Sequence, residues 1–433
     1  MNNQRSIWLV IGDFACFGVG LYLFLLGVYG YHGFAKALDI HAFPMAILAI
    51  IWMVVFYVFN FYDLRHTKPD MLFVRKFIIS AVICLGIGFI FFYINPLTRI
   101  TPKSNLLIFE ALSFICIFGF RRLFHVTSLK STHTRLAIVC SEEKYHPLVS
   151  EINNNPQLGF ETLGTFKSMQ DFILANVPAD LLIIHNIHES ESALLEKVLA
   201  SHIEVIDLAK AYETILYKIP IDFIDNQWLI HSITKNAYQF DKFIARVISL
   251  VFALIVGIVT LPISLAIIIA IKLEDRGPIL YKNDRVGIHG KPFFLYKFRS
   301  MVINAENGKA VWATGDHDPR ITKVGRITRK LHIDEIPQLL NIIKGDITLV
   351  GPRPERPEFV AQLEKEVPYY FMRHTISPGF TGWAQIKFRY ARTVLDSQEK
   401  FEYDLFYIKN RNVFLDIGII LKTVQIIFTH AGK

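Results

Sequence analysis

The C-terminal third of the chain contains the stretch RKLHIDEIPQLLNIIKGD, residues 329–346, in which two adjacent carboxylates follow a basic segment. Pro337 suits the first position of a helix, and apolar residues recur around it at helical spacing as far as Gly345, where a helix is expected to end. Asp334 and Glu335 are therefore predicted at a helix N-terminus. Free N–H groups and the helix dipole favour a bound phosphate at such a position.

The residues around Asp334 and Glu335 indicate whether the pair belongs to a ligand-binding site or only caps a helix. An Asp-Glu pair before a helix is usually a cap and a first-turn charge. Here Arg329 precedes the pair, and Arg353 follows it within GPRP, residues 351–354. The two prolines restrict the backbone on both sides of Arg353 and can present its guanidinium rigidly. The pattern predicts a place where a metal ion and a phosphate meet.

The composition of the whole chain indicates a membrane protein of about two to four domains. Of its 433 residues, 52% are hydrophobic, and the mean hydropathy of +0.36 is too high for an ordinary soluble enzyme. The net charge of +8 suits a protein that works against anionic headgroups or phosphates. The four cysteines show neither a disulfide framework nor a zinc spacing, so inert packing is expected for all of them.

Apolar stretches near the N-terminus predict four membrane-spanning helices, at residues 7–29, 43–62, 77–94 and 106–120. Basic residues are concentrated after the second and fourth stretches. The positive-inside rule therefore predicts a cytoplasmic N-terminus and a return to the cytoplasm after the fourth helix. Asp13 and Glu110 fall within or near these stretches. We expect a structural role for Asp13 and leave the role of Glu110 open.

A small α/β domain is predicted after these helices. Residues 136–140, 181–185 and 203–208 read as buried strands, residues 145–153 read as a helix, and the segments between them can be helical. Strands that alternate with helices indicate a parallel, Rossmann-like sheet. A dinucleotide site needs a glycine-rich turn after the first strand, where this chain has CSEE, residues 140–143. We therefore expect no dinucleotide cofactor, and a regulatory, oligomerising or vestigial role.

Residues 247–271 form a fifth apolar segment, which Pro262 interrupts near its centre. An ordinary kinked transmembrane helix and a helix that enters the membrane and returns are both compatible with this pattern. A full crossing would place the C-terminal third on the opposite face of the membrane from the middle domain. Hydropathy alone leaves the two alternatives open.

Basic residues of the C-terminal third recur in patterns that suit anionic ligands. Lys297 and Arg299 alternate with aromatic residues, so on a strand both would lie on one face, as a phosphate clamp or merely as its polar side. Residues 320–330 carry basic side chains at helical spacing, which indicates either a helix against lipid headgroups or a solvated face. Residues 415–428 are apolar but short and include Lys422, which favours an interfacial helix.

The C-terminal third also carries a long series of short motifs. In chain order they are GP at 277–278, RVG at 285–287, KFRSM at 297–301, DPRIT at 318–322, DEIPQL at 334–339, KGD at 344–346, GPRP at 351–354, PGFTGWAQ at 378–385 and YDLFYIKN at 403–410. The series resembles the bacterial sugar transferases known as polyprenyl-phosphate hexose-1-phosphate transferases, over about residues 247–428. The N-terminal helices and the middle domain resemble those of large members that initiate exopolysaccharide or O-antigen synthesis.

The resemblance implies a reaction. A nucleoside-diphosphate sugar, usually a UDP-sugar, gives its sugar-1-phosphate to a polyprenyl phosphate, usually undecaprenyl phosphate, and UMP leaves. It also implies a multi-pass protein of the bacterial inner membrane, in contact with the lipid bilayer, whose catalytic domain lies on the cytoplasmic face. Mg2+ is the implied cofactor, and no nucleic-acid partner is expected. The donor sugar and self-association into a homo-oligomer are left open.

The resemblance further implies roles for single residues. Asp334 would be the nucleophile that holds a phosphosugar covalently, and Glu335 would assist magnesium binding or deprotonate the lipid phosphate, so these two are the expected metal ligands. A carboxylate can attack phosphorus, and arginines with a hard cation can neutralise a diphosphate. The expected phosphate- and substrate-binding residues are Lys297, Arg299, Arg329, Arg353 and Arg285. The residues expected to shape the nucleotide end are Pro378, Gly379, Thr381, Trp383 and Gln385.

The expected fold has three parts. Residues 1–125 form four transmembrane helices, residues 126–235 form the Rossmann-like α/β domain, and residues 236–433 form an α+β membrane-associated catalytic domain with a re-entrant helix at 247–271. The re-entrant helix of the family bends at a proline, which favours a hairpin at Pro262.

The start of this helix departs from the family pattern. Family members often carry a lysine before the helix arginine and an aspartate three residues after it, whereas here Ala245 and Ser249 stand at those positions around Arg246. How the hairpin is anchored is therefore left open by the sequence.

Two other classes of function compete with the enzyme. A membrane scaffold for polysaccharide assembly with an inert site is disfavoured, because Asp334, Glu335 and Arg353 all match the family's motifs. A multi-span sensor whose middle domain binds a ligand is disfavoured by the missing glycine-rich turn. Turnover of a nucleotide sugar separates the enzyme from both.

Overall fold

The computed structural model describes residues 2–68, 70–94, 102–130, 133–141, 143–185, 192–201, 203–224, 239–303, 305, 318, 320–388 and 393–430. The chain separates into two compact units, Met1–Leu216 and Tyr217–Lys433. Each unit contains its own cluster of buried apolar side chains.

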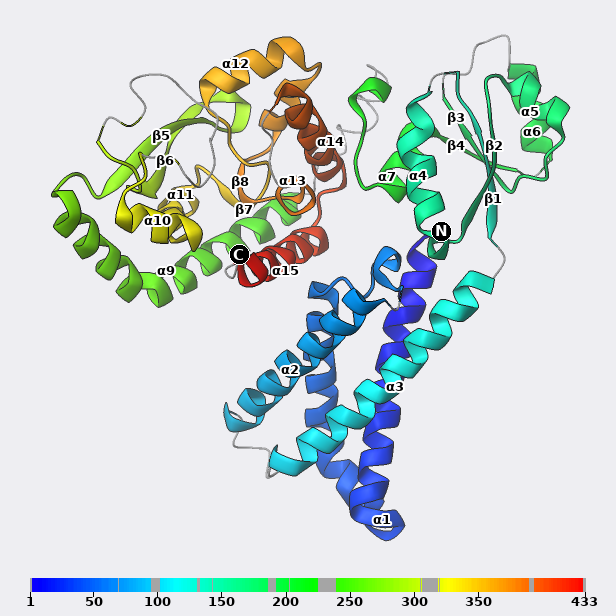
Figure 1. Cartoon of the computed structure of the whole chain (residues 1–433), viewed down its shortest axis with the longest axis horizontal. Coiled ribbons are helices and arrows are strands. Elements are labelled where there is room, and N and C mark those ends of the chain that lie inside the picture. Colours follow the sequence, from blue (N-terminus) through cyan, green and yellow to red (C-terminus); the bar gives the residue numbers. More distant parts are fainter. Residues whose placement is uncertain are drawn as a thin grey trace. The chain divides into compact units, whose positions relative to one another are not determined.

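The first unit begins with a helical hairpin. Helix α1 spans Asn2–Val58, but at Gly30 the backbone leaves the helical conformation (φ 61°, ψ 178°) and the chain folds back (Figure 1). The ring of Phe17 consequently lies 5.7 Å from that of Trp52. The two arms of α1 correspond to the first two predicted apolar helices. Helices α2 (Met71–Ile94) and α3 (Pro102–Lys130) correspond to the third and fourth.

Some helices of the fold have the length and the apolar composition of membrane-spanning helices. Among the described residues, three helices are long and apolar enough to cross a membrane, over Arg5–Val58, Met71–Ile94 and Asp241–Asp275. The layout with four spans stays a prediction. α3 packs closely along α1, because a Cβ atom at Gly20 would lie only 2.8 Å from the Cα of Ser113.

A buried ion pair joins α1 to α3. The guanidinium of Arg121 donates to the carboxylate of Asp13, and the two side chains are 3% and 0% exposed. A second nitrogen of Arg121 donates to the carbonyl of Phe61 at 2.7 Å. The guanidinium also lies over the rings of Phe56 and Tyr62, at 5.7 and 5.5 Å from their centroids. This geometry agrees with a structural role for Asp13.

The α/β domain of the first unit contains a four-stranded parallel sheet of order β2-β1-β3-β4. Its strands are β1 (Thr134–Val139), β2 (Phe160–Phe166), β3 (Leu181–Ile184) and β4 (Glu204–Asp207), and its helices are α4 (His146–Asn154), α5 (Met169–Ala175), α6 (Ser192–Ala200) and α7 (Leu208–Ile215). Arg5 of α1 donates to the carbonyl of Gln157 in this domain at 3.4 Å. The predicted parallel α/β architecture is confirmed.

Strand β2 corrects one expectation. Residues 160–166 were expected among segments that can be helical, yet they form the outer strand beside β1. Gly159, with φ 80°, turns the chain into this strand, and the register shifts between Leu136 and Ala137 of β1 to accommodate it. The run FETLGTF is rich in aromatic and β-branched residues, which favour a strand, and its pairing with β1 completes the sheet edge.

The second unit carries the C-terminal motifs on short elements around one core. In chain order these are α9 (Gln239–Asp275), the antiparallel pair β5 (Leu280–Val286) and β6 (Pro292–Phe298), α10 (Lys323–Lys330), α11 (Gln338–Lys344), β7 (Thr348–Val350), α12 (Pro357–Glu366), β8 (Gly379–Thr381), α13 (Trp383–Lys387), α14 (Val394–Asn410) and α15 (Val413–His430). β7 and β8 pair in parallel. Phe401, Leu405 and Tyr407 of α14 are fully buried, so α14 forms the centre of this core.

The segment 217–224 belongs to this second unit. Ile219, Ile221 and Ile224 are buried in its core. The indole N–H of Trp383 donates to the carbonyl of Tyr217 at 3.0 Å. The division between the units therefore falls between residues 216 and 217, upstream of the expected boundary at 235–236.

Both arms of helix α9 pack on the second unit. The helix bends visibly along its length (Figure 1) and contains Pro262. Ala253 in the first arm is buried in the main core, and Ile267 and Ile271 in the second arm pack with Phe298 of β6. Between the two arms the apolar side chains are exposed, for example Ile258 at 72%.

Arg246 and Ser249 fasten the first arm of α9. The guanidinium of Arg246 donates to the carbonyls of Ile342 and Ile343, at 2.5 and 2.9 Å, at the end of α11. The hydroxyl of Ser249 accepts the N–H of Leu349 at 3.0 Å and donates to the carbonyl of Ala245 at 2.6 Å. A serine thus anchors the helix at the position where the family often carries an aspartate.

We expect replacement of Arg121 by methionine to destabilise the first unit, because the buried carboxylate of Asp13 would lose its cation. Removing one partner of a buried ion pair costs about 3–5 kcal/mol. The midpoint of thermal unfolding in detergent measures the loss. The double variant Asp13→Asn/Arg121→Met should recover part of it, and a double variant less stable than Arg121→Met would contradict this account.

Ser249→Ala is expected to lower the free energy of unfolding by about 1–3 kcal/mol, because the buried N–H of Leu349 would lose its acceptor. Chemical denaturation in detergent measures this change. Ser397→Ala is the matched control, since that buried helix serine only donates to the carbonyl of Thr393. Equal losses of unfolding free energy in Ser249→Ala and Ser397→Ala would show that the hydrogen bond between Ser249 and Leu349 adds no extra stability, and would contradict this prediction.

Candidate active site

The two adjacent carboxylates lie in a tight turn between α10 and α11. Residues Ile333–Glu335 form a single 3-10 turn, which follows His332 in the left-handed conformation (φ 55°). Pro337 is the residue before α11, so the helix begins one position later than expected, and Gly345 ends it with φ 91°. The predicted order of acids, helix and glycine stop is therefore present.

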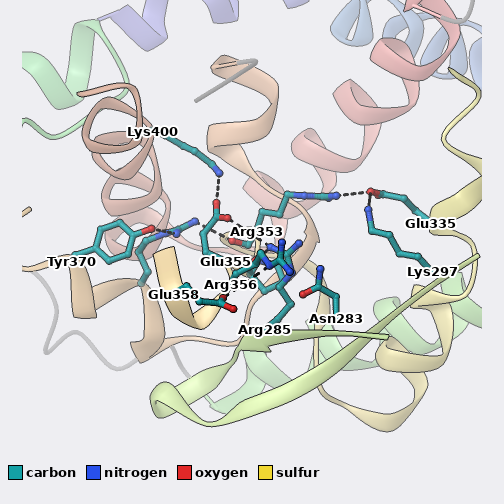
Figure 2. Close-up of polar contacts among 12 residues, drawn as sticks. Asn283, Arg285, Lys297, Glu335, Arg353, Glu355, Arg356, Glu358, Tyr370 and Lys400 are labelled. Atoms are coloured by element: carbon teal, nitrogen blue, oxygen red, sulfur yellow. Dashed lines mark hydrogen bonds and ion pairs between the residues drawn. The ribbon is translucent and has the colours of Figure 1, made fainter. Parts of the chain in front are cut away.

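Two cations hold the carboxylate of Glu335. Lys297 of β6 donates to its Oε1 at 2.6 Å, and Arg353 donates to the same atom at 2.5 Å (Figure 2). The Glu335 side chain is 14% exposed. The two cations outweigh the effect of burial and hold the pKa of Glu335 well below its ordinary value. Glu335 is therefore a permanent anion in an ion-paired setting.

Asp334 lies in a different electrostatic environment. It is 7% exposed. Burial raises its pKa above the ordinary value, and the neighbouring charge of Glu335 acts in the same direction. Lys297 and Arg329 oppose this shift through their positive charges. Adjacent carboxylates with pKa values shifted in opposite directions are typical of sites where the two groups have different tasks.

Arg299 directly follows β6, and its ion-pair partner is at the end of α9. Its guanidinium donates to the carboxylate of Asp275. A Cβ atom at position 277 would lie 1.9 Å from a guanidinium nitrogen of Arg299, which explains the glycine of the GP motif. Asp275 was not singled out from the sequence, where it stands as one acid at a helix end.

Arg285 supports the loop that follows β7. Its guanidinium donates to the carbonyl of Pro354 at 3.0 Å and lies 3.7 Å from the carboxylate of Glu355. Burial lowers the pKa of Arg285 from its ordinary value, although Glu355 opposes this shift. Among the predicted phosphate-binding residues, Lys297 and Arg353 thus bond the dyad directly, and Arg285 bonds the loop.

The segment expected at the nucleotide end is largely built into the core. Gly379 and Thr381 lie on β8, and the hydroxyl of Thr381 shares a hydrogen bond of 2.6 Å with that of Thr423. The ring of Trp383 stacks on Phe406 with centroids 5.4 Å apart. These contacts give Thr381 and Trp383 packing roles, and the assignment of Pro378 to Gln385 to a nucleotide stays a prediction.

A buried network of charges surrounds the GPRP loop. Arg373 bonds Asp404 at 2.9 Å. Figure 2 shows Lys400, which bonds Glu355 at 2.6 Å. Sequence reasoning quoted Asp404 only as part of a motif and did not single out the others. A basic residue with an acid about thirty positions later carries no local periodicity, so the sequence offered no signal for this pairing.

The dyad fits one common mode of magnesium binding. No group of three or more His, Cys, Asp or Glu side chains in the described part of the chain could hold a metal ion. Magnesium is often held by one or two carboxylates together with water and the phosphates of a substrate. Oxygen Oε1 of Glu335 already accepts two charged hydrogen bonds. The carboxylate of Asp334 and the second oxygen of Glu335, Oε2, are therefore the atoms that the dyad would offer to such an ion.

Comparison with known proteins gives the family. Residues 240–430 match the model of the family described as bacterial sugar transferase. A relative from Bacillus subtilis (strain 168), named "Uncharacterized sugar transferase EpsL", is 39% identical over 188 residues, 88% of its own length and 43% of this chain. The chain belongs to the bacterial sugar transferase family.

Two longer relatives of this bacterial sugar transferase are named for a reaction. The "UDP-N-acetylgalactosamine-undecaprenyl-phosphate N-acetylgalactosaminephosphotransferase" of Aeromonas hydrophila is 40% identical over 238 residues, 55% of each chain. The "UDP-glucose:undecaprenyl-phosphate glucose-1-phosphate transferase" of Escherichia coli (strain K12) is 38% identical over 186 residues, 42% of this chain and 40% of its own length. The matched part of this chain thus spans about half of these relatives or less.

We expect the stabilising effect of Glu335 to depend on pH. Its pKa is lowered from 4.5 in the folded protein, so its ionisation stabilises the fold above that value, and this contribution is lost as the pH falls below it. The gap between the unfolding midpoints of the wild type and Glu335→Gln should therefore be constant above about pH 6 and narrow progressively as the pH falls below about 5.

The control for this experiment is Glu358→Gln, because the side chain of Glu358 is 61% exposed. Its unfolding midpoint should follow that of the wild type at every pH. A gap for Glu335→Gln that stays constant with pH would contradict the ion-paired state of Glu335.

Proposed function

We propose that this bacterial sugar transferase moves sugar-1-phosphate from a UDP-sugar to undecaprenyl phosphate and releases UMP. The names of the relatives from Aeromonas hydrophila and Escherichia coli support the lipid acceptor and the class of reaction. The observation that carries the proposal is the anion of Glu335, fixed between Lys297 and Arg353 directly beside the buried carboxylate of Asp334.

The proposed reaction has two displacements at one phosphorus. A carboxylate oxygen of Asp334 attacks the sugar-linked phosphorus, the bond from this phosphorus to the bridging oxygen breaks, and UMP leaves with the electron pair. An oxygen of undecaprenyl phosphate then attacks the same phosphorus, and the bond to Asp334 breaks. The product is undecaprenyl-diphosphate-sugar, and the carboxylate is regenerated.

The environments of the two acids suit these steps. Burial weakens the solvation of the Asp334 carboxylate, as its raised pKa indicates, and a poorly solvated anion is a more reactive nucleophile. Lys297, Arg329 and Arg353 supply fixed positive charge for the diphosphate, which costs no reorganisation during the reaction. Magnesium held by Asp334 and Glu335 would add further positive charge to the diphosphate when bound.

We further propose that α9 is re-entrant. Arg246 near its start contacts α11, and Asp275 at its end pairs with Arg299, so both ends of the helix contact the same unit. A helix that crossed the bilayer would place these ends on opposite faces. The exposed apolar side chains around Pro262 would then lie in the bilayer, and the bend would turn the chain back.

We propose, in line with this arrangement, that the catalytic unit lies on the cytoplasmic face of the bacterial inner membrane, where UDP-sugars are available. We propose that the arms of α1, α2 and α3 supply four spans, consistent with the basic residues after the second and fourth. The pathway would be the first membrane step of exopolysaccharide, O-antigen or capsule synthesis.

The test is release of UMP by the full-length protein in detergent with undecaprenyl phosphate and magnesium. A panel of UDP-glucose, UDP-galactose, UDP-N-acetylglucosamine and UDP-N-acetylgalactosamine identifies the donor. We expect release with one donor and a loss of more than about a thousandfold in Asp334→Asn, because the nucleophile is removed. The matched control Asp284→Asn, at an exposed carboxylate on β5, should retain full activity.

Equal activity in Asp334→Asn and the wild type would refute the assignment of the nucleophile. An absence of UMP with every donor, from a protein that unfolds cooperatively, would refute the proposed reaction and favour a scaffold in polysaccharide assembly.

A further inference from the structure

The loop that presents Arg353 is held by its backbone as well as by its prolines. The carbonyl oxygen of Arg353 accepts a hydrogen bond of 3.0 Å from the guanidinium of Arg373. The other end of the same residue, its guanidinium, donates to Glu335 at 2.5 Å. Arg373 therefore contacts Arg353, which bonds the dyad, while its own hydrogen bonds go to Arg353, Asp404 and Tyr370.

Arg373 is itself held in one orientation. Its Nε donates to the carboxylate of Asp404 at 2.9 Å, and its Nη1 donates to the hydroxyl of Tyr370 at 2.5 Å. The side chains of Arg373 and Asp404 are only 3% and 1% exposed. The guanidinium also lies over the Tyr370 ring, 5.2 Å from its centroid. All three guanidinium nitrogens thus have a fixed partner, and the third partner is the backbone of Arg353.

A buried ion pair of this kind is expensive for stability alone. Desolvation of the two charges often equals or exceeds their attraction, and apolar residues of similar size are frequently as stable. A planar guanidinium, however, directs its donors in one rigid fork, whereas a lysine ammonium donates from a single point on a flexible stem. The geometry of Arg373 therefore suits a positioning task better than a purely stabilising one.

Glu355, two residues after Arg353 in the same loop, is also held by contacts to other elements. Lys400 of α14 bonds the carboxylate of Glu355 at 2.6 Å, and the backbone N–H of Val286 donates to the carbonyl of Glu355 at 3.0 Å (Figure 2). The loop is thus fixed from α14 on one side and from β5 on the other. Only Arg353, between these supports, extends to the dyad.

We propose that Arg373, oriented by Asp404 and Tyr370, is a positioning residue that sets Arg353 against the dyad. The inference rests on the proposed function and adds a residue outside the motifs to it. Displacement of a charged group by about 1 Å can cost about a hundredfold in rate. Loss of the guanidinium fork at position 373 should therefore reduce turnover through Arg353.

The kinetic test is a double-mutant cycle in the full-length protein, with UMP release as the readout. We expect Arg373→Lys to lower kcat about 10- to 100-fold with less than about a threefold change in KM for the donor. In a background of Arg353→Lys, the same change should lower kcat less than about twofold, because Arg373 acts through Arg353. Losses that multiply in the double variant would overturn the proposal.

Two further variants complete this test, one as a control and one as a substitute for Arg373→Lys. Arg135→Lys changes an equivalent arginine–carboxylate pair, to Asp180, whose side chains are 42% and 43% exposed, and it should leave kcat unchanged. If Arg373→Lys does not fold, Tyr370→Phe removes one acceptor of the guanidinium while keeping the ring. Tyr370→Phe should lower kcat by a smaller factor than Arg373→Lys, and this factor should again shrink in the Arg353→Lys background. Losses of kcat that multiply in the double variant would again overturn the proposal.

A second cycle needs no enzymatic activity and separates this inference from the proposed function. If Arg373 sets Arg353 against Glu335, the shift in unfolding midpoint caused by Glu335→Gln should be at least about halved in a background of Arg373→Lys. Equal shifts in both backgrounds would overturn the positioning role, whatever the protein catalyses. Coupled shifts in a protein that releases no UMP would keep the positioning role and reject the reaction.

Discussion

One carboxylate oxygen, Oε1 of Glu335, holds the catalytic unit's three functional segments together. Lys297 reaches it from β6, and Arg353 reaches it from the loop after β7. A buried carboxylate is stable as an anion only where such partners offset its desolvation, so the contact constrains all three segments. Asp334 beside it is also buried. Burial and the charge of Glu335 raise the pKa of Asp334, whereas Arg353 and Lys297 lower that of Glu335. Two neighbouring acids thereby acquire unequal reactivity from their surroundings.

Much of the fold follows from patterns that are local in the chain. The apolar helices, the stop at Gly345 and three of the four parallel strands rest on periodicity and on single residues with special backbone preferences. Strand β2 was not predicted, although its aromatic and β-branched residues favour an extended conformation beside β1. The anchoring of α9 depends on a long-range contact, since Ser249 bonds Leu349, a hundred residues later.

Prediction of the candidate site from the sequence was likewise only partly successful. The sequence placed Arg353 near the dyad and gave Lys297 only as one of a basic pair for phosphate, and the structure bonds both to Glu335. The assignment of Arg285 and Trp383 to ligand binding stays a prediction, and in the structure the first bonds the loop and the second is stacked in the core. A motif shows which residues a chain shares with its family. Whether a side chain faces a ligand or a neighbouring element depends on packing that a motif does not encode.

The central claim is that Asp334 carries the phosphosugar during turnover. The most direct measurement is the mass of the full-length protein after incubation with its UDP-sugar and magnesium, without lipid acceptor, followed by peptide mapping. The account predicts an added mass of one sugar phosphate on the peptide that contains Asp334, absent from Asp334→Asn and removed by undecaprenyl phosphate. An active protein with no adduct, or with the adduct on another residue, would contradict it.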